Sequence, residues 1–440
     1  MNKFVITALI LFLGFSTLEA QPVQWKLEDC ILYAIEHNIS IKQIELQTKN
    51  AEIEVNTSQM SRLPNLNAGL GQNWNFGRTQ TQSGLYENQS QSNTSLSISS
   101  SMPLFTGFRI PNEIEKSKLE LQAATQNLEK AKEDLSLNIA SLFLQVLFNK
   151  EILKINRDQL ELSQSQTARI EALVDAEKAP VSQMYDIEAQ IANDRVSVIQ
   201  AENNLKLSLL DLAQSLELEN SVDFDVAAPE FDIDANILLP HAVFDNAVEQ
   251  KPVIKELQFR VESAERTLKI AKSGYLPSLS LSMGYSTNYF YLNNRNYVNR
   301  SFADQFKNNA GEYIGLNLNI PIFNRFTVRN QVRSAQINIE NQQLSLENAK
   351  KTLYKEIQTA YMNAVAAQEK YRAAGQAVKS TQESFKYARE KYEAGKSSIF
   401  EFNEIKTRFV KSQSEEVQAK YDYIFRTKIL DFYNGIQLKL

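Results

Sequence analysis

Four short stretches of alternating apolar and polar residues stand out in the hydrophobic pattern of the chain. They lie at residues 65–76, 95–104, 278–285 and 314–320. In each stretch one set of alternate positions is predominantly apolar, and the other set is small, polar and uncharged. Strict alternation over about ten residues is typical of a tilted strand that crosses a bilayer. The pattern therefore predicts four transmembrane strands. The alternative is a small amphipathic sheet on soluble helices, whose polar face would normally carry Lys and Glu.

Helical periodicity fills most of the remaining chain. One helix is predicted over 25–60, and a much longer one over 110–175, where leucine recurs every seven residues. Such sustained heptads indicate coiled-coil packing. The long helix and its later copy end at short breaks, 177–180 and 395–398, after which return helices run to Leu218 and Gly435. Each long helix should therefore pair antiparallel with its return helix.

The strand-and-helix pattern occurs twice. Residues 95–124 align with 313–342 at a constant offset of 218, and the match continues along both halves. We therefore divide the chain into a signal peptide (1–20), a first repeat (21–221), an acidic connector (222–240) and a second repeat (241–440). The prolines expected to bound the strands are Pro64, Pro103, Pro277 and Pro321. The segments 77–93 and 292–310 are rich in Asn, Gln and Ser, and are predicted to be exposed loops.

The strand count sets the expected assembly. Four strands cannot close on themselves, and an open sheet edge is not tolerated in lipid. A dimer would supply eight strands, and side chains fill the interior of an eight-stranded barrel. A trimer would supply twelve strands and leave a passage. The small polar residues on the inner faces favour the trimer. The predicted fold class is an α+β membrane protein: two pseudo-repeats of long antiparallel coiled-coil hairpins and four transmembrane strands per protomer. Three protomers would form a twelve-stranded β-barrel on an α-helical barrel.

Composition narrows the function. The first 20 residues have one Lys and an apolar run, as in a secretory signal peptide, and no later segment reaches the ~18 apolar residues of a spanning helix. The net charge of −5 makes nucleic acid an unsuitable partner. Cys30 is the only cysteine, so it forms no intramolecular disulfide, and a buried apolar role is expected for it.

No catalytic or metal-binding motif is present, and no cofactor is expected. The two histidines, His37 and His241, lie in different halves and do not align in the repeat. There is no HExxH, GxSxG or phosphate-loop pattern. The sequence therefore predicts a protein that is not an enzyme. A soluble periplasmic coiled-coil adaptor or scaffold remains the alternative to a membrane channel.

The ordered set of motifs resembles the TolC family of outer membrane efflux proteins, the outer membrane factors. It comprises the doubled P-L/I-F-x-x-F at 103–108 and 321–326, the doubled L-P, and the tip segment 392–404. The resemblance covers nearly all of the mature chain. It implies a homotrimeric exit duct in the outer membrane of a Gram-negative cell, with a long periplasmic helical extension. The duct would contact outer-membrane lipid, dock with a periplasmic adaptor protein and an inner-membrane RND or ABC pump, and serve efflux or type I secretion.

The resemblance also implies site residues. Tyr392 matches a tyrosine of the family's periplasmic gate, and Glu401 and Glu404 match acidic positions of the constriction. The family's latch arginine and aspartate fall on Ser397 and Gln183, so the ionic latch is not carried over, and a hydrogen-bonded or apolar closure should replace it. Asp186 is a nearby acid without an assigned role. The residues expected to dock the adaptor are Ala179, Pro180, Gly395 and Ser398.

Overall fold

The computed structural model describes residues 24–80, 84–88, 90–219, 224–229, 237–293, 297–436 and 438. The predicted signal peptide and part of the connector lie outside these residues. The chain forms two compact units, and each draws on both halves of the sequence. We call residues 40–132 and 240–357 the strand unit, and residues 1–39, 133–239 and 358–440 the helical unit.

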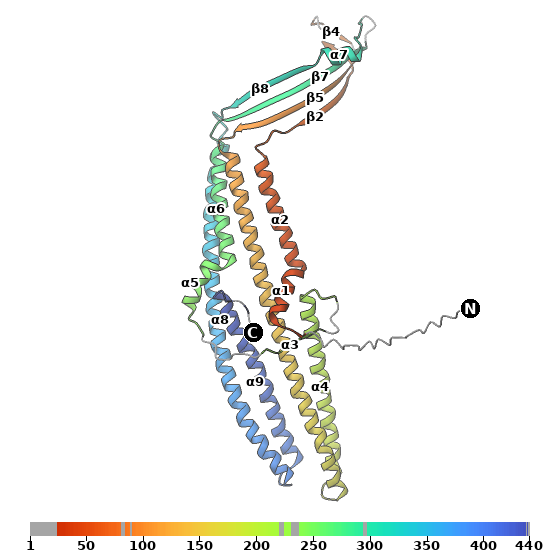
Figure 1. Ribbon diagram of the computed structural model, residues 1–440, viewed down its shortest axis with the longest axis vertical. Helices are drawn as coiled ribbons and strands as arrows, with labels where there is room; N and C mark the ends of the chain where they lie inside the picture. The colour runs from red at the N-terminus through yellow and green to blue at the C-terminus, as the bar shows by residue number, and fades with distance from the viewer. Residues whose placement is uncertain are drawn as a thin grey trace, which may run out of the picture. The chain divides into compact units, whose positions relative to one another are not determined.

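The strand unit contains one antiparallel four-stranded sheet (Figure 1). Its strand order is β2-β5-β7-β8. The strands are β2 (Asn67–Asn75), β5 (Ser90–Phe105), β7 (Ser278–Asn293) and β8 (Gly311–Asn319). All four predicted strands are therefore present, and β2 and β8 form its two edges.

The register places apolar residues opposite one another. Leu281 lies opposite Leu316, and its neighbour Ser282 lies opposite Gly315. Leu70 likewise faces Leu96 across the first strand pair. Because side chains alternate along a strand, one face of the sheet is apolar and the other is small and polar. The apolar face is exposed in the protomer: Leu70 retains 76% of its accessible surface and Leu316 67%.

The strands β5 and β7 are longer than predicted, at 16 residues each. The predicted loop at 77–93 holds short strands β3 (Arg78–Gln80) and β4 (Tyr86–Asn88), and the one at 292–310 holds helix α7 (Phe302–Asn308). Side-chain hydrogen bonds order this polar segment: Gln305 of α7 bonds both backbone groups of Phe290, at 3.0 and 2.8 Å. The described parts of both segments are largely exposed, as predicted, but they hold short regular elements that composition did not indicate.

Three of the four prolines lie outside the strands, as predicted. Pro64 and Pro277 precede β2 and β7, and Pro321 follows β8. The prediction was wrong for Pro103, which lies within β5, where the register shifts between Pro103 and Phe105. A bulge tolerates proline because the ladder hydrogen bond is already interrupted there.

The long helices match the heptad prediction closely. They are α3 (Arg109–Asp175) and α8 (Thr327–Glu393), of 67 residues each. The return helices are α4 (Ser182–Ser215) and α9 (Ile399–Tyr433). Contacts across the first pair run in opposite directions, since Asn149 bonds Asn204 whereas the later Ser163 bonds the earlier Asp194. The antiparallel hairpins are confirmed.

The predicted helix over 25–60 is two helices, α1 (Leu27–His37) and α2 (Ile39–Met60). The break is at Asn38, whose backbone is extended and whose side chain donates to the Ser215 carbonyl at 3.3 Å. Asparagine often bonds backbone groups in this way and competes with helix formation. The remaining helices, α5 (Pro240–Gln250) and α6 (Pro252–Ser273), belong to the strand unit.

The core of the helical unit gathers side chains from α1, α3, α4 and α9. Phe143 and Leu212 are fully buried there, beside Cys30. Burial raises the pKa of the Cys30 thiol to about 12, so the group stays protonated and inert, and its predicted buried role is confirmed. Phe224 and Val226 of the connector join this core, and β6 (Asp225–Val226) pairs parallel with β1 (Gln24–Trp25).

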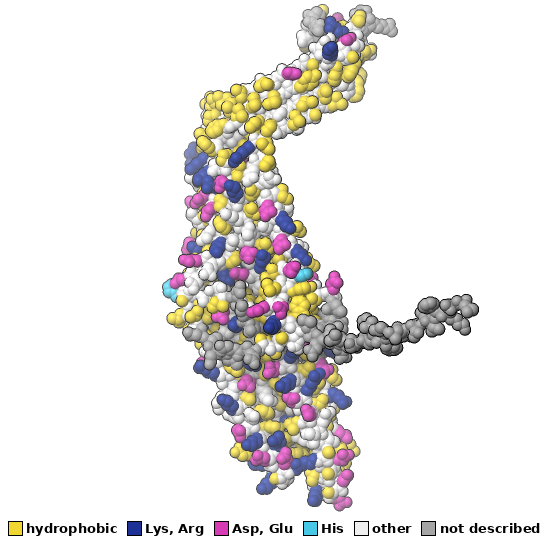
Figure 2. Space-filling model, viewed as in Figure 1, with side chains coloured by type: hydrophobic (Ala, Val, Ile, Leu, Met, Phe, Trp, Pro, Cys, Tyr) yellow, Lys and Arg dark blue, Asp and Glu magenta, His cyan; other side chains and the backbone are white. Residues whose placement is uncertain are grey.

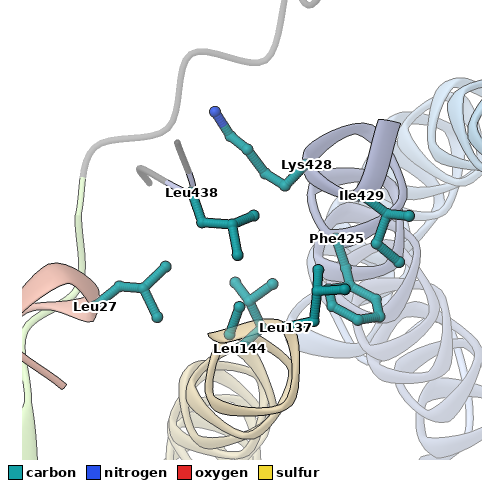
Figure 3. Close-up of a pocket in the computed structure, with 8 residues that line it drawn as sticks. Leu27, Leu137, Leu144, Phe425, Lys428, Ile429 and Leu438 are labelled. Atoms are coloured by element: carbon teal, nitrogen blue, oxygen red, sulfur yellow. The ribbon is translucent and has the colours of Figure 1, made fainter. Parts of the chain in front are cut away.

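A small apolar pocket marks where the chain's end meets this core (Figure 3). Leu27, Leu144 and Phe425 point toward one another, and Leu438 closes the space from the C-terminal side. The space is too narrow for a water molecule, so we interpret it as a packing gap.

Left-handed backbone positions repeat with the sequence. Glu177, with a φ of 56°, matches Gly395, with a φ of 70°, at the offset of 218. Glu217 and Gly435 form a second such pair, and Phe108 and Phe326 a third. The duplication is therefore visible in the backbone turns as well as in the elements. Within the described residues, no helix is long and apolar enough to cross a membrane.

Candidate functional site at the hairpin tips

Two tight turns of the same kind end the hairpins of the helical unit. At the first tip, the Lys178 amide donates to the Leu173 carbonyl at 2.8 Å and the Glu177 amide to Val174 at 2.9 Å. At the second tip, Lys396 and Gly395 make the equivalent bonds, at 2.9 and 3.0 Å. This is the Schellman arrangement that satisfies the last carbonyls of a helix. Gly395 is the predicted helix terminator, and the Ser398 hydroxyl accepts from the Glu401 amide at 3.2 Å, as an N-cap does.

The two tips are joined by a buried apolar cluster, which we call the tip cluster. Each of the four hairpin helices contributes at least one side chain to it. Its buried members are Ile170, Ile187, Ala388, Tyr392, Ile399 and Phe402. Hydrophobic burial is therefore what holds the two hairpins of one protomer together at this end.

Tyr392 lies inside the tip cluster, with 9% of its surface exposed. Its ring stacks on Phe402 at 5.0 Å, and the Arg169 guanidinium lies 5.5 Å from its centre. Arg169 also donates to the carbonyl oxygens of Tyr392 and Glu393, at the end of α8. Burial raises the pKa of the Tyr392 phenol, so it stays neutral. An arginine from α3 thus caps α8 and covers the tyrosine, in addition to the apolar contacts.

A buried ionic network ties the hairpins together further along. Lys406 of α9 is 1% exposed, and its ammonium donates to the Ser163 hydroxyl of α3 at 2.6 Å. Ser163 donates in turn to Asp194 of α4, whose carboxylate lies 3.6 Å from Lys406. Gln190 donates to the other Asp194 oxygen at 2.8 Å. Burial lowers the pKa of Lys406, and the Asp194 carboxylate opposes that shift. We call Ser163, Asp194 and Lys406 the buried triad.

A groove of 590 Å³ runs along α4 and α9 beside the tips. Asp186, the acid without an assigned role, lines it together with Phe400 and Glu404. Glu404 is paired with Arg408 at 2.5 Å, and both side chains are more than half exposed. Glu401 is exposed in the first turn of α9. The two acidic residues predicted at the constriction thus differ in charge environment.

The four predicted docking residues lie at the turns themselves. Pro180, Gly395 and Ser398 are exposed, and Ala179 is half-buried. Large apolar side chains are exposed near them: Tyr185 at 68% and Phe400 at 78%. The tips therefore combine a buried apolar interior with exposed aromatic side chains on an outer surface that also carries charged residues.

Sequence analysis missed Arg169 and the buried triad. A signal was present, because Lys406 interrupts an apolar series at heptad spacing, Ile399, Phe402 and Phe409. Asp194 interrupts a similar series between Ile187 and Val198. Two opposite charges at core positions of partner helices indicate a buried ion pair more strongly together than either charge does alone. Arg169 carries no such pattern.

The protomer, with an exposed apolar sheet and two long helical hairpins, has the fold of an outer-membrane channel subunit. The family model "Outer membrane efflux protein" matches residues 31–217 and 243–430. The chain therefore belongs to this family, which is one of transport channels rather than enzymes, and it is an outer membrane protein of the TolC type.

Curated relatives share little sequence with this chain, and similar solved structures share most of its fold. "Probable outer membrane lipoprotein SilC" of Salmonella typhimurium is 21% identical over 309 residues, which is 69% of this chain and 62% of SilC. TolC of Vibrio cholerae is 22% identical over 228 residues, 51% of this chain and 50% of that protein. These alignments thus span about half to two thirds of the relatives. A CusC structure superimposes with a TM-score of 0.77 at 17% identity, covering 94% of this chain and 93% of CusC.

Proposed function

We propose that the protein is the trimeric exit duct of a tripartite efflux or type I secretion system. It would pass substrates across the outer membrane from an inner-membrane RND or ABC pump, through a periplasmic adaptor. The observation that carries the proposal is the sheet: four strands, two open edges and an exposed apolar face. The family membership favours this channel over the soluble adaptor alternative.

The open edges support a closed assembly. Strands β2 and β8 each expose a row of unpaired backbone groups, and lipid offers them no hydrogen bonds. Pairing β8 of one protomer with β2 of the next removes every edge once the ring is complete. Three protomers give twelve strands, and the small uncharged residues of the inner face, such as Ser282 and Gly315, leave room for a passage.

The tips are the proposed gate and docking surface. Tyr392 would hold the closed state through the tip cluster and Arg169, and Glu401 and Glu404 would contribute negative charge near the axis. The adaptor would dock on the turns at Ala179, Pro180, Gly395 and Ser398, beside the exposed Tyr185 and Phe400. Exposed aromatic side chains of this kind are enriched among interface anchors.

The first test is the native mass of the full chain, extracted in mild detergent from the outer-membrane fraction. We expect three copies per particle and stepwise conductance in a planar bilayer. A particle of one or two copies contradicts the duct.

A pair of substitutions tests the membrane face. Leu316→Lys places a charge on the apolar face of β8, and Asn317→Lys places the same charge on the opposite face of the same strand. A lipid-facing Lys at the bilayer centre costs about 2–4 kcal/mol. We expect Leu316→Lys to deplete the trimer from outer membranes and Asn317→Lys to leave it in place. Equal behaviour of the two variants contradicts the assignment of the faces.

A further inference from the structure

The junction between sheet and long helices carries an aromatic pair in each repeat. Phe105 and Phe108 meet edge to face at 5.4 Å, and Phe323 and Phe326 do so at 5.6 Å. The second pair is strongly exposed, Phe323 at 72%, and Ile322 beside it retains 94% of its surface. Such residues at the end of an apolar strand match the position of an interfacial belt.

The second repeat adds three arginines to this junction. Arg325 lies in the turn before α8, and Arg329 and Arg333, four residues apart, lie on one side of the helix start. We call these three residues the arginine stripe. All three are exposed, and none forms an ion pair with a carboxylate in the part of the chain that the structure describes. The guanidinium of Arg329 lies 5.6 Å from the centre of the Phe326 ring, directly below the exposed aromatic pair.

The first repeat has no counterpart. The offset of 218 places Gly107, Pro111 and Glu115 where the second repeat has its arginines. The one arginine at the first junction, Arg109, is neutralised by Glu113 at 2.8 Å. Arg325 even adopts a left-handed φ of 54°, a position that glycine fills in the first repeat. An arginine there costs about 1 kcal/mol of backbone strain, so the packing of the helix start does not explain its presence.

The two exposed sides of α8 differ in charge. Val328 and Ala335 are buried, and they mark the side of α8 that packs against the rest of the strand unit. One flank of α8, about 100° around the helix from this buried side, carries uncharged polar residues. They are Thr327, Gln331, Ser334, Asn338 and Ser345. On the other flank lie Arg329, Arg333, Glu340 and Glu347. The charged flank begins just after Ile322 and Phe323, the exposed apolar residues between β8 and α8.

We propose that the arginine stripe binds the phosphate headgroup of an anionic phospholipid in the leaflet nearest the periplasm, once per protomer. The acyl chains would lie along Ile322 and Phe323, and the phosphate would accept hydrogen bonds from Arg325, Arg329 and Arg333. Guanidinium groups suit phosphate because they donate two parallel hydrogen bonds, and Phe326 holds one of them in place. The inference rests on the proposed function, since it requires the apolar face to contact lipid. Figure 2 shows Lys and Arg side chains directly below the apolar surface at the end of the sheet.

The test counts lipids on the intact trimer. The full chain is reconstituted in nanodiscs of equal parts phosphatidylglycerol and phosphatidylcholine, released, and analysed by native mass spectrometry. The test variant is Arg329→Gln/Arg333→Gln, and the matched control is Arg372→Gln/Arg389→Gln, two exposed arginines on the same helix. We expect wild type and control to retain phosphatidylglycerol selectively, and the test variant to lose about tenfold or more of that selectivity, at roughly fivefold per arginine.

Four results would overturn the inference. If wild type retains the two lipids equally, the chain has no site for the anionic lipid. If the control variant loses as much selectivity as the test variant, the effect comes from total positive charge and not from the arginine stripe. Displacement of the lipid by millimolar inorganic phosphate would assign the stripe to free phosphate instead. Trimer mass and conductance are measured on every variant. A test variant that keeps the trimer mass and conductance but loses lipid selectivity supports the site. A wild-type chain that does not insert into the bilayer contradicts the proposed function and this inference together.

Discussion

At the scale of single residues, the most informative feature is a glutamate in a glycine's conformation. Glu177 and Gly395 occupy the same position in the two tip turns, with φ values of 56° and 70°. Both turns make the same pair of Schellman bonds, but the first adds a bond from the Ala179 amide to the Leu173 carbonyl, and the second is followed by the Ser398 N-cap. A residue with a Cβ pays about 1–2 kcal/mol for this backbone region, and glycine pays almost nothing.

Glu177→Gly should therefore stabilise the first tip. Part of the gain is lost because glycine is more flexible in the open state, which leaves about 0.5–1 kcal/mol. The measurement is hydrogen exchange of the Lys178 and Ala179 amides, which both donate to Leu173. We expect their protection to rise about two- to fivefold, while Glu177→Gln, which keeps the strain and removes the charge, leaves it unchanged. Lower protection in the glycine variant would contradict the strain argument.

At this scale the sequence was predictive only where residue type and conformation agree. Gly395 and Ser398 are typical cap residues, and the structure places both at caps. Glu177 carries no such signal, because nothing in a glutamate indicates a left-handed turn. Arg169 was missed for a related reason: its contacts are with backbone oxygens 223 and 224 residues away, and no local pattern marks them.

At the scale of elements, the buried triad raises a question of energy. Two charges and a hydroxyl occupy positions on α3, α4 and α9 that apolar residues would fill more simply. Desolvation of a buried ion pair can outweigh its attraction, so the triad need not add net stability. What it does provide is pairing specificity, because a register shift of either hairpin would leave a buried charge without its partner.

This view predicts strong coupling between Lys406 and Asp194. Lys406→Met should weaken the packing of α4 against α9 by about 3–5 kcal/mol, since it leaves the Asp194 carboxylate buried without its cation. Asp194→Asn should cost a similar amount. The double variant should cost little more than either single one, because no uncompensated charge remains. Hydrogen exchange of peptides from α4 and α9 in the full chain measures the three effects.

The control is Lys411→Met on the same helix. Lys411 is 75% exposed and lies 3.9 Å from Glu415, a surface pair expected to contribute at most about 1 kcal/mol. Additive costs for Lys406 and Asp194 would show that the two side chains do not act as a pair.

Element prediction succeeded where periodicity was long and failed where single polar residues decide. The heptads of α3 and the alternation of β8 gave the elements within a few residues, since each extends over several repeats of its period, whereas β7 continues to Asn293, beyond its predicted end at 285. The break between α1 and α2 rests on one asparagine, and α7 on the side-chain bonds of Gln305. Such specific bonds form only after distant segments meet, so periodicity does not reveal them.

At the scale of the whole molecule, the compact units do not follow the repeats. Each unit takes segments from both halves, because a hairpin from one repeat packs against its copy rather than against its own strands. The sequence duplication predicted the elements but not this partition. In the proposed trimer one protomer would present a third of the passage, and the role of an axial residue would depend on the same residue in the other two protomers.

Glu401 is where the trimer can be tested through a single residue. It is exposed in the first turn of α9, and the alternative role is an ordinary solvated position at a helix start, where acidic residues are favoured. If three copies surround the axis, Glu401→Gln removes three charges from one constriction. We expect lower cation selectivity and roughly tenfold weaker block by divalent cations in low-salt planar bilayers, because a narrow acidic ring concentrates cations. Glu415→Gln, farther along the same helix, is the matched control. Unchanged selectivity and block in the Glu401 variant would place this carboxylate away from the axis and leave Tyr392 and the tip cluster to close the passage without an acidic ring.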